Sequence, residues 1–244
     1  MAFENAQQSR ILAASLHLSG YTKKVTAKYD IAMLDVTTIL DGAKKFIPGI
    51  DMSTETLDLY LDTDTTAGGL WSTLNTLKGL QDFPVSDFPS GMTRGNEVWL
   101  TNAIATNSST DNSGVETVVG ASLNFQTDGA TDFGLSLIDL TTLTTAAGVT
   151  NQTAIDNGAA TANGGVWHVH VTAFATYTND TFRLEHSTDN STFTTLDTAT
   201  VVTGTTYERR VVAPGTTVNR YVRFAETTTG STGSITRQAS FARR

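Results

Sequence analysis

Threonine is the feature that most constrains the fold of this chain: 45 of the 244 residues are threonine, whereas only 16% are charged. Because its β-branched side chain favours pleated strands over helix interiors, threonine at this density predicts a β-rich protein. The 20 glycines and 4 prolines indicate many short strands joined by tight turns. The chain is long enough to fold around its own core, as one large or two small domains.

The bulk composition narrows the possible functions. Cysteine is absent, which excludes disulfides and thiolate metal sites. No apolar run approaches the roughly 20 residues that span a bilayer, and the opening "MAFENAQQSR" lacks the pattern of a signal peptide. We therefore expect synthesis in the cytoplasm and no membrane partner. The net charge of −8 disfavours nonspecific nucleic-acid binding, which depends on lysine and arginine.

Alternating apolar residues predict a long hairpin near the N-terminus. Residues 1–11 are polar and unpatterned, which is typical of a flexible arm. Residues 12–34 alternate on both sides of a "SGYT" turn and predict a half-buried ribbon. The strand "TETLDLYLD" follows further along the chain and buries three leucines on one side.

Two short helices are predicted beside these strands. In "DVTTILDGAKKFIPGI", Thr38 is a plausible N-cap and Pro48 ends the apolar stripe, which predicts a helix near 38–47. A second stripe of leucines, followed by Gly79 as a C-terminal cap, predicts a helix near 66–78.

The rest of the chain predicts a further β portion. A first β domain would extend over 12–140, and a Thr/Ala/Gly-rich stretch over 141–165 is typical of a surface loop or a seam. Six strand-like segments with short polar turns then fill 166–244, a spacing that indicates an antiparallel β-sandwich.

Two histidines are candidates for a metal site. His168 and His170 alternate along one predicted strand, so their side chains share a face. A third ligand, His186 or Glu185, would have to come from a neighbouring strand. Because no HExxH motif or second-shell pattern supports such a site, we expect polar sheet-face histidines and no cofactor.

Other motifs for chemistry are weak. "DTDTT" at 62–66 and "STDNSG" at 109–114 have the oxygen-rich composition of calcium loops, but they lack the glycine and glutamate of an EF-hand. No nucleophile elbow or phosphate-binding glycine motif is present. Paired acids for sugar cleavage need proximity only in space, so they stay open. We expect a protein that is not an enzyme.

The C-terminal part is locally basic, with tyrosine and phenylalanine interleaved. In a nucleic-acid binder this mixture would matter. Because the chain is acidic overall, ion pairing between strands or subunits is the favoured interpretation. The arginines are Arg209, Arg210, Arg220, Arg223, Arg237, Arg243 and Arg244.

Two blocks of the chain together resemble the major tail proteins, or tail tube proteins, of bacteriophages with long non-contractile tails (siphoviruses). "LHLSGYTKKVTAKYDIAMLDVTTILDGAKKFIPGIDMSTETLDLYLD" resembles their N-terminal core, in which a "DVTT" segment, a short basic helix and an "IPG" turn recur in this order. "HSTDNSTF", "VNRYVRF" and the final "SFARR" resemble the ending common in tail proteins of actinobacterial phages. The match covers about 12–62 and 165–244.

The resemblance implies a tail-tube-type β-sandwich or barrel with flanking short helices, whose hairpin and arm reach neighbouring subunits. Such subunits form rings of six, and the rings stack into a channel for DNA ejection. Genomic DNA would pass without specific binding, and the tape measure and tail terminator proteins would be further partners. The protein would localise to the tail of the virion.

The resemblance also suggests site residues. A net negative charge repeated around a ring gives a like-charged wall, and the candidate wall residues are Asp30, Asp58 and Asp62. Lysines on the same hairpin face would attract phosphate and oppose this assignment. The candidate contacts between subunits are Lys24, Lys28, Arg220 and Arg223.

The alternative function is another virion component. A capsid decoration or tail-tip protein could bind host-surface sugar through its C-terminal sandwich, if aromatic residues such as Trp167 or Tyr177 line a groove. A secreted carbohydrate-binding domain or enzyme is disfavoured by the missing signal and catalytic patterns.

Overall fold

A computed structural model describes residues 8–61, 70–111 and 119–244, and it confirms the predicted mainly β fold. The chain forms two compact units. The first contains Met1–Gly20, Phe83–Leu100 and Asp132–Arg244, and the second contains Tyr21–Asp82 and Thr101–Thr131. These units interleave along the chain, whereas the division predicted from the sequence is linear.

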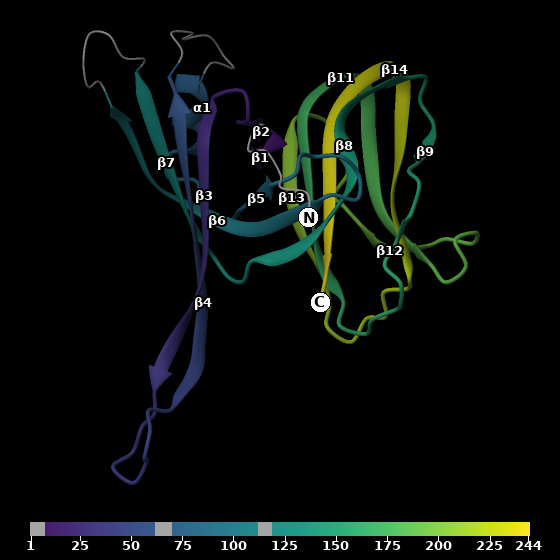
Figure 1. The fold of residues 1–244 in the computed structure, drawn as a ribbon. Coiled ribbons are helices and arrows are strands. Elements are labelled where there is room, and N and C mark those ends of the chain that lie inside the picture. The colour runs from purple at the N-terminus through teal and green to yellow at the C-terminus, as the bar shows by residue number, and fades with distance from the viewer. Residues whose placement is uncertain (1–7, 62–69, 112–118) are drawn as a thin grey trace. The chain divides into compact units, whose positions relative to one another are not determined.

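The first unit is built from long antiparallel strands (Figure 1). Its strands are β1 (Arg10–Ala13), β2 (Leu16–His17), β5 (Phe83–Phe88), the start of β6 (Glu97–Asp111), β8 (Asp132–Thr145), β9 (Val149–Asn151), β10 (Ile155–Asp156), β11 (Gly165–Ser187), β12 (Thr194–Thr198), β13 (Thr206–Val212) and β14 (Tyr221–Arg243). Their order is β12-β11-β14-β8-β6-β5-β1-β2, with β13 beside β11, and β9 and β10 beside β14.

β11 and β14 replace four of the six predicted C-terminal segments, because each continues for 23 residues where the sequence indicated a turn. Both strands bend where their pairing shifts register, between Val171 and Asn179 on β11. Thr176 (φ 73°) and Gly230 (φ 97°) adopt left-handed backbone conformations at this bend. Figure 1 shows the two strands arching over together.

The bend lets the two halves of β11 and β14 enclose one core. One half of β11 pairs with β13 and the other half pairs with β12, and β14 similarly divides its pairing between β8 and the two short strands β9 and β10. Burial of each large apolar side chain contributes roughly 1.5–3 kcal/mol to stability. The central members are Trp167, Phe182, Leu184, Phe224 and Phe241.

The second unit is a four-stranded antiparallel sheet with one short helix. Its elements are β3 (Thr22–Asp35), β4 (Phe46–Tyr60), α1 (Leu70–Leu77), the rest of β6, and β7 (Gly120–Thr127), and its strand order is β3-β4-β7-β6. α1 lies within the range predicted for the second helix, and Leu70, Leu74 and Leu77 on it are buried. Residues 66–69 lie outside the described ranges.

The helix predicted near 38–47 is wrong. Residues 36–45 form a loop, and β4 already begins at Phe46, so the long hairpin pairs β3 with β4 rather than with residues 12–18. Ile39 is fully exposed, so the predicted apolar stripe has no surface to pack against. A two-turn helix without such packing is not stable in water.

Two other predicted segments also differ. Within 141–165, β8 continues to Thr145, and β9 and β10 add short pairings to β14, so this stretch is more regular than a surface loop. The predicted arm at 1–11 lies mostly outside the described residues, and β1 begins at Arg10. Within the described ranges, no helix is both long and apolar enough to traverse a bilayer.

Candidate assembly surface

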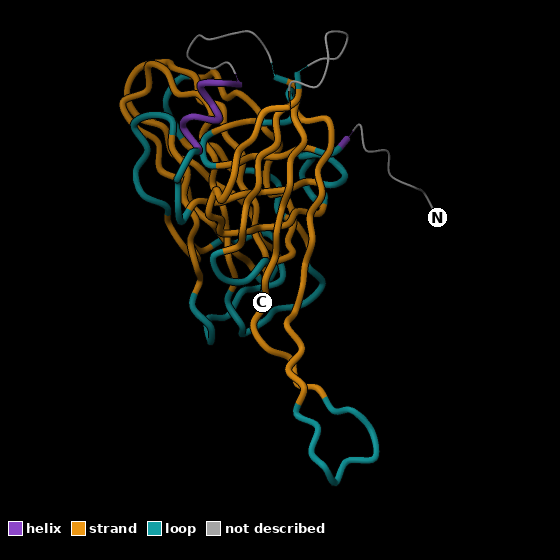
Figure 2. The backbone as a smooth tube through the Cα atoms, turned by 90° about the vertical axis from the view of Figure 1, so that its left-hand side faces the viewer, coloured by secondary structure: helices purple, strands orange, loops and turns teal. Residues whose placement is uncertain are grey.

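The β3–β4 hairpin is paired on only part of its length. β4 contacts β7 from Thr54 to Tyr60, whereas its first residues, from Phe46 to Met52, pair with β3 alone. Within the described residues, β3 pairs with no strand other than β4. The distal half is therefore a two-stranded ribbon with open backbone edges (Figures 1 and 2), and such a ribbon is only marginally stable in water.

This distal half concentrates the exposed apolar surface. Of the fifteen large apolar residues that are exposed in the described part of the chain, ten lie between residues 29 and 52. Contiguous apolar surface on a soluble protein marks a site of interaction. The ten residues are Tyr29, Ile31, Met33, Leu34, Val36, Ile39, Leu40, Phe46, Ile47 and Met52.

The loop at the tip is held in shape by its polar residues. Asp41 accepts hydrogen bonds from the backbone N–H and the hydroxyl of Thr38, both at 2.8 Å, and it forms an ion pair with Lys45. The Lys45 ammonium and the Thr38 groups lower the pKa of Asp41, so its carboxylate stays charged at neutral pH. Ile39 (102% exposed) and Leu40 (93% exposed) therefore project from a preformed loop.

The sheet of the second unit has one polar face. Cross-strand partners place Thr26 beside Thr56 and Asn124, and Lys24 beside Asp58 and Ser122. This is the face on which the sequence placed the candidate wall residues. Two of its three predicted acids are described, Asp30 and Asp58, and Asp62 lies outside the described residues.

These acids do not form an acidic patch. Lys28 forms an ion pair with Asp30, and Lys24 is the direct cross-strand partner of Asp58. Each predicted wall acid that the structure describes thus has a predicted contact lysine of the same chain beside it. Hydroxyl and amide groups, rather than unbalanced charge, dominate this face.

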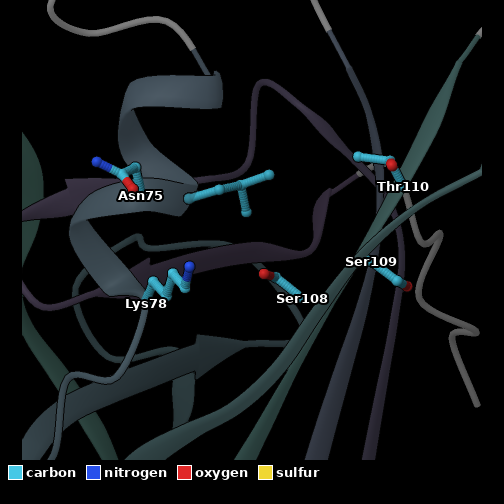
Figure 3. Close-up of a pocket in the computed structure, with 6 residues that line it drawn as sticks. Asn75, Lys78, Ser108, Ser109 and Thr110 are labelled. Carbon is cyan, nitrogen blue, oxygen red and sulfur yellow. The ribbon is translucent and has the colours of Figure 1, made fainter.

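The opposite face of the same sheet carries buried leucines, and α1 lies beside it. Leu57 and Leu123 are register partners and are fully buried. Ser108, the partner of Leu123 on β6, lines a pocket of about 280 Å³ with Leu74 of α1. Figure 3 shows the other lining residues, Asn75, Lys78, Ser109 and Thr110. None of the described lining residues is an acid or a histidine, so these residues offer no acid–base pair.

The predicted contact residues Arg220 and Arg223 are already paired within the chain. Arg220 donates two hydrogen bonds of 2.6 Å to Asp156. Arg223 binds Glu185 at 2.6 Å and lies over the ring of Phe193. Their role between subunits stays a prediction.

His168 and His170 share a face as predicted, but they belong to a buried hydrogen-bond chain. The Ser86 hydroxyl lies 3.1 Å from His168 Nδ1 and 2.8 Å from His170 Nε2. Because His170 Nδ1–H donates to the Ala14 carbonyl at 2.6 Å, its Nε2 accepts from Ser86, whose oxygen accepts from His168. Burial lowers the pKa of His170 to about 4, so this ring is neutral near pH 7.

The two candidates for a third metal ligand, His186 and Glu185, have other hydrogen-bond and ion-pair partners. His186 Nδ1 accepts a hydrogen bond from the backbone N–H of Asn219, and Glu185 pairs with Arg183 and Arg223. In the ranges that the structure covers, no three acidic or histidine side chains come together as a metal site. The candidate calcium stretch at 62–66 and the second half of the stretch at 109–114 lie outside the described residues.

The prediction that Trp167 or Tyr177 lines a sugar-binding groove, which the alternative function needs, is wrong. Trp167 is fully buried and its indole N–H donates to Asp197 at 2.8 Å. Tyr177 is 5% exposed and its hydroxyl donates to the Thr145 carbonyl at 2.9 Å. Neither ring can stack on a sugar, since both fill the core of the first unit.

The sequence did not identify the tip residues Ile39 and Leu40 as functional, because it assigned them to a helix. The signal that could have found them is an apolar pair between two threonines and an Asp-Gly pair, which indicates a turn as readily as a cap.

The comparisons with known proteins give fold likeness only. No family model and no curated protein matches the chain. It is similar to the tail of an empty gene transfer agent particle with C6 symmetry (TM-score 0.42, 11% identity, 54% of this chain and 98% of that chain). It is also similar to the SPP1 tail tube (0.43, 12%, 52% and 77%) and to the SPP1 Dit protein (0.39, 12%, 96% and 99%).

Proposed function

We propose that this chain is a structural subunit of a phage tail tube, which assembles with copies of itself into stacked rings of six around a channel for DNA. The sequence resemblance to tail tube proteins supports this proposal. The observation that carries it is the hairpin tip, where apolar side chains lie exposed on a ribbon with open edges. The role is structural and not catalytic, it is exercised in the virion tail, and tape measure and terminator proteins are its further partners.

The free energy of assembly comes from this ribbon. Covering a side chain such as Leu40 contributes roughly 1.5–3 kcal/mol, and pairing the open edge of β3 satisfies backbone groups that water satisfies in the free subunit. Covering several such side chains contributes more free energy than the hairpin loses when assembly restricts its conformational freedom. A subunit with this surface is therefore more stable in an assembly than alone.

The polar face of the second unit is the proposed channel wall. Nonspecific DNA binding requires lysines whose charge is available to phosphates. Here Lys24 and Lys28 lie beside Asp58 and Asp30, so the wall presents hydroxyl, amide and internally balanced charge. DNA slides past such a wall without a stable contact.

The assembly proposal predicts that the double variant Ile39→Asp/Leu40→Asp loses self-association. Because both side chains are exposed, thermal unfolding of the subunit should not change. Sedimentation and negative-stain electron microscopy of the wild type should show rings or tubes, and the variant should require at least roughly tenfold higher concentration to form them. The matched control is Val149→Asp/Val201→Asp, which changes two exposed valines of the first unit. A wild type that stays monomeric at every concentration and salt would contradict the proposal.

The wall proposal predicts that Asp30→Asn/Asp58→Asn makes assembled tubes bind DNA. The change frees Lys28 and Lys24, so duplex DNA should co-sediment with the variant at low salt and be released as salt rises. Asp82→Asn/Asp128→Asn is the control, because it removes the same charge from exposed positions away from the lysines of this face. Equal DNA binding by both variants would show that this polar face is not the channel wall.

A further inference from the structure

The first unit carries an apolar hollow on its surface. β6 and β8 pair at its floor, and Val98, Trp99, Phe133 and Leu135 line a cavity of about 320 Å³. Trp99 and Phe133 pack edge to face with ring centroids 5.0 Å apart. Phe133 is nevertheless 53% exposed, which is unusual for a phenylalanine already packed against a tryptophan. The hollow is therefore an apolar site that stays partly exposed in the part of the subunit that the structure describes.

The hairpin tip has the complementary form. Ile39 and Leu40 are adjacent aliphatic side chains with almost no contacts of their own, and the polar loop fixes the direction in which they project. Aliphatic groups inserted between aromatic rings are typical anchors at the centre of an interface.

The charges around the two surfaces are also complementary. Lys44 lies beside the tip with 76% of its side chain exposed, and its one ion pair in the described residues is a long one of 3.8 Å to Asp35. Glu97, at the edge of the hollow, is an exposed acid. Opposite charges at the rim favour the correct orientation of two surfaces, and like charges would oppose it.

We propose that the tip of one copy, with Ile39 and Leu40, seats in the Trp99–Phe133 hollow of a second copy. This inference rests on the proposed self-assembly and names the surface that receives the hairpin. Each chain carries one tip and one hollow, so the contact is heterologous. A heterologous contact continues from copy to copy and closes into a ring or extends as a tube.

The absence of cysteine from the natural chain makes the test direct. Leu40→Cys and Phe133→Cys subunits are purified separately, mixed at a concentration that gives assemblies, and oxidised mildly. A disulfide requires Cα atoms within roughly 7 Å, so it reports seating of the tip in the hollow. We expect the mixed disulfide to exceed, by roughly tenfold, the yield of the control pair Leu40→Cys with Val201→Cys. Peptide mass spectrometry identifies the linked residues.

Two further variants keep the test decisive. Glu97→Cys replaces Phe133→Cys if loss of the ring disturbs folding, because Glu97 lies at the exposed rim. Glu97→Lys should weaken assembly roughly fivefold, and Lys44→Glu on the same chain should restore it. Assemblies without a mixed disulfide would overturn the tip-in-hollow contact and leave the tail tube proposal intact. A wild-type chain that never assembles would overturn both.

Discussion

Replacing Arg237 by methionine is expected to destabilise the first unit by about 3–5 kcal/mol, because the change leaves two buried acids without their cation. Arg237 is 2% exposed, and Glu226 and Asp180 are fully buried beside it. The guanidinium donates to both carboxylate oxygens of Glu226, and to the carbonyl and hydroxyl of Thr141 at 2.9 Å. Urea denaturation of the purified subunit measures the loss.

Arg220→Met is the matched control for this prediction. Arg220 also forms a two-bond pair, with Asp156, but both side chains are almost half exposed, so solvent replaces the lost contacts. The double variant Arg237→Met/Glu226→Leu should recover part of the stability, because it removes both members of the buried pair. If Arg237→Met cost no more than Arg220→Met, the buried pair would not stabilise this unit.

The sequence predicted the fold class better than the connections between strands. Threonine and the period-two alternation identify strands, because both depend on local residues. Gly230 and Thr176 could mark either turns or bends. The pairing of β11 with β14 decides between the two, and it joins residues at this place that lie more than forty positions apart in the chain. Local signals are the same in both cases, since a bend and a turn each need a residue that tolerates positive φ.

The candidate surface was predicted only in part. The alternation placed Asp30, Asp58, Lys24 and Lys28 on one face correctly, because strand periodicity fixes faces. Lys28 and Asp30 pair within β3, whereas the placement of Lys24 opposite Asp58 depends on the register of β3 against β4, which the misassigned helix concealed. Ile39 and Leu40 fit a helical stripe equally well in isolation, and only the absence of a surface under them decides otherwise.

Asp180 has the opposite effect on stability to Arg237, because its buried carboxyl group destabilises the fold when it is ionised. Both of its carboxylate oxygens are buried without a hydrogen-bond partner. Burial, and secondly the negative charge of Glu226, raise the pKa of Asp180 to about 7. The folded state thus keeps a proton that the unfolded chain releases near pH 4. Stability from this group is greatest below pH 4, declines as the pH rises to about 7, and stays low above it.

Asp180→Asn removes this penalty and is expected to stabilise the subunit by about 2–4 kcal/mol at pH 8, with almost no effect at pH 4. Comparing variant and wild type at each pH cancels the buried histidines, which destabilise the fold in acid in both proteins. Asp189→Asn is the control of opposite sign, because the backbone N–H groups of Thr192 and Ser191 lower the pKa of Asp189 to about 2. That variant should lose stability at pH 8. A pH-independent gain for Asp180→Asn would show that the carboxyl is neutral throughout, and that its burial carries no ionisation cost in the fold.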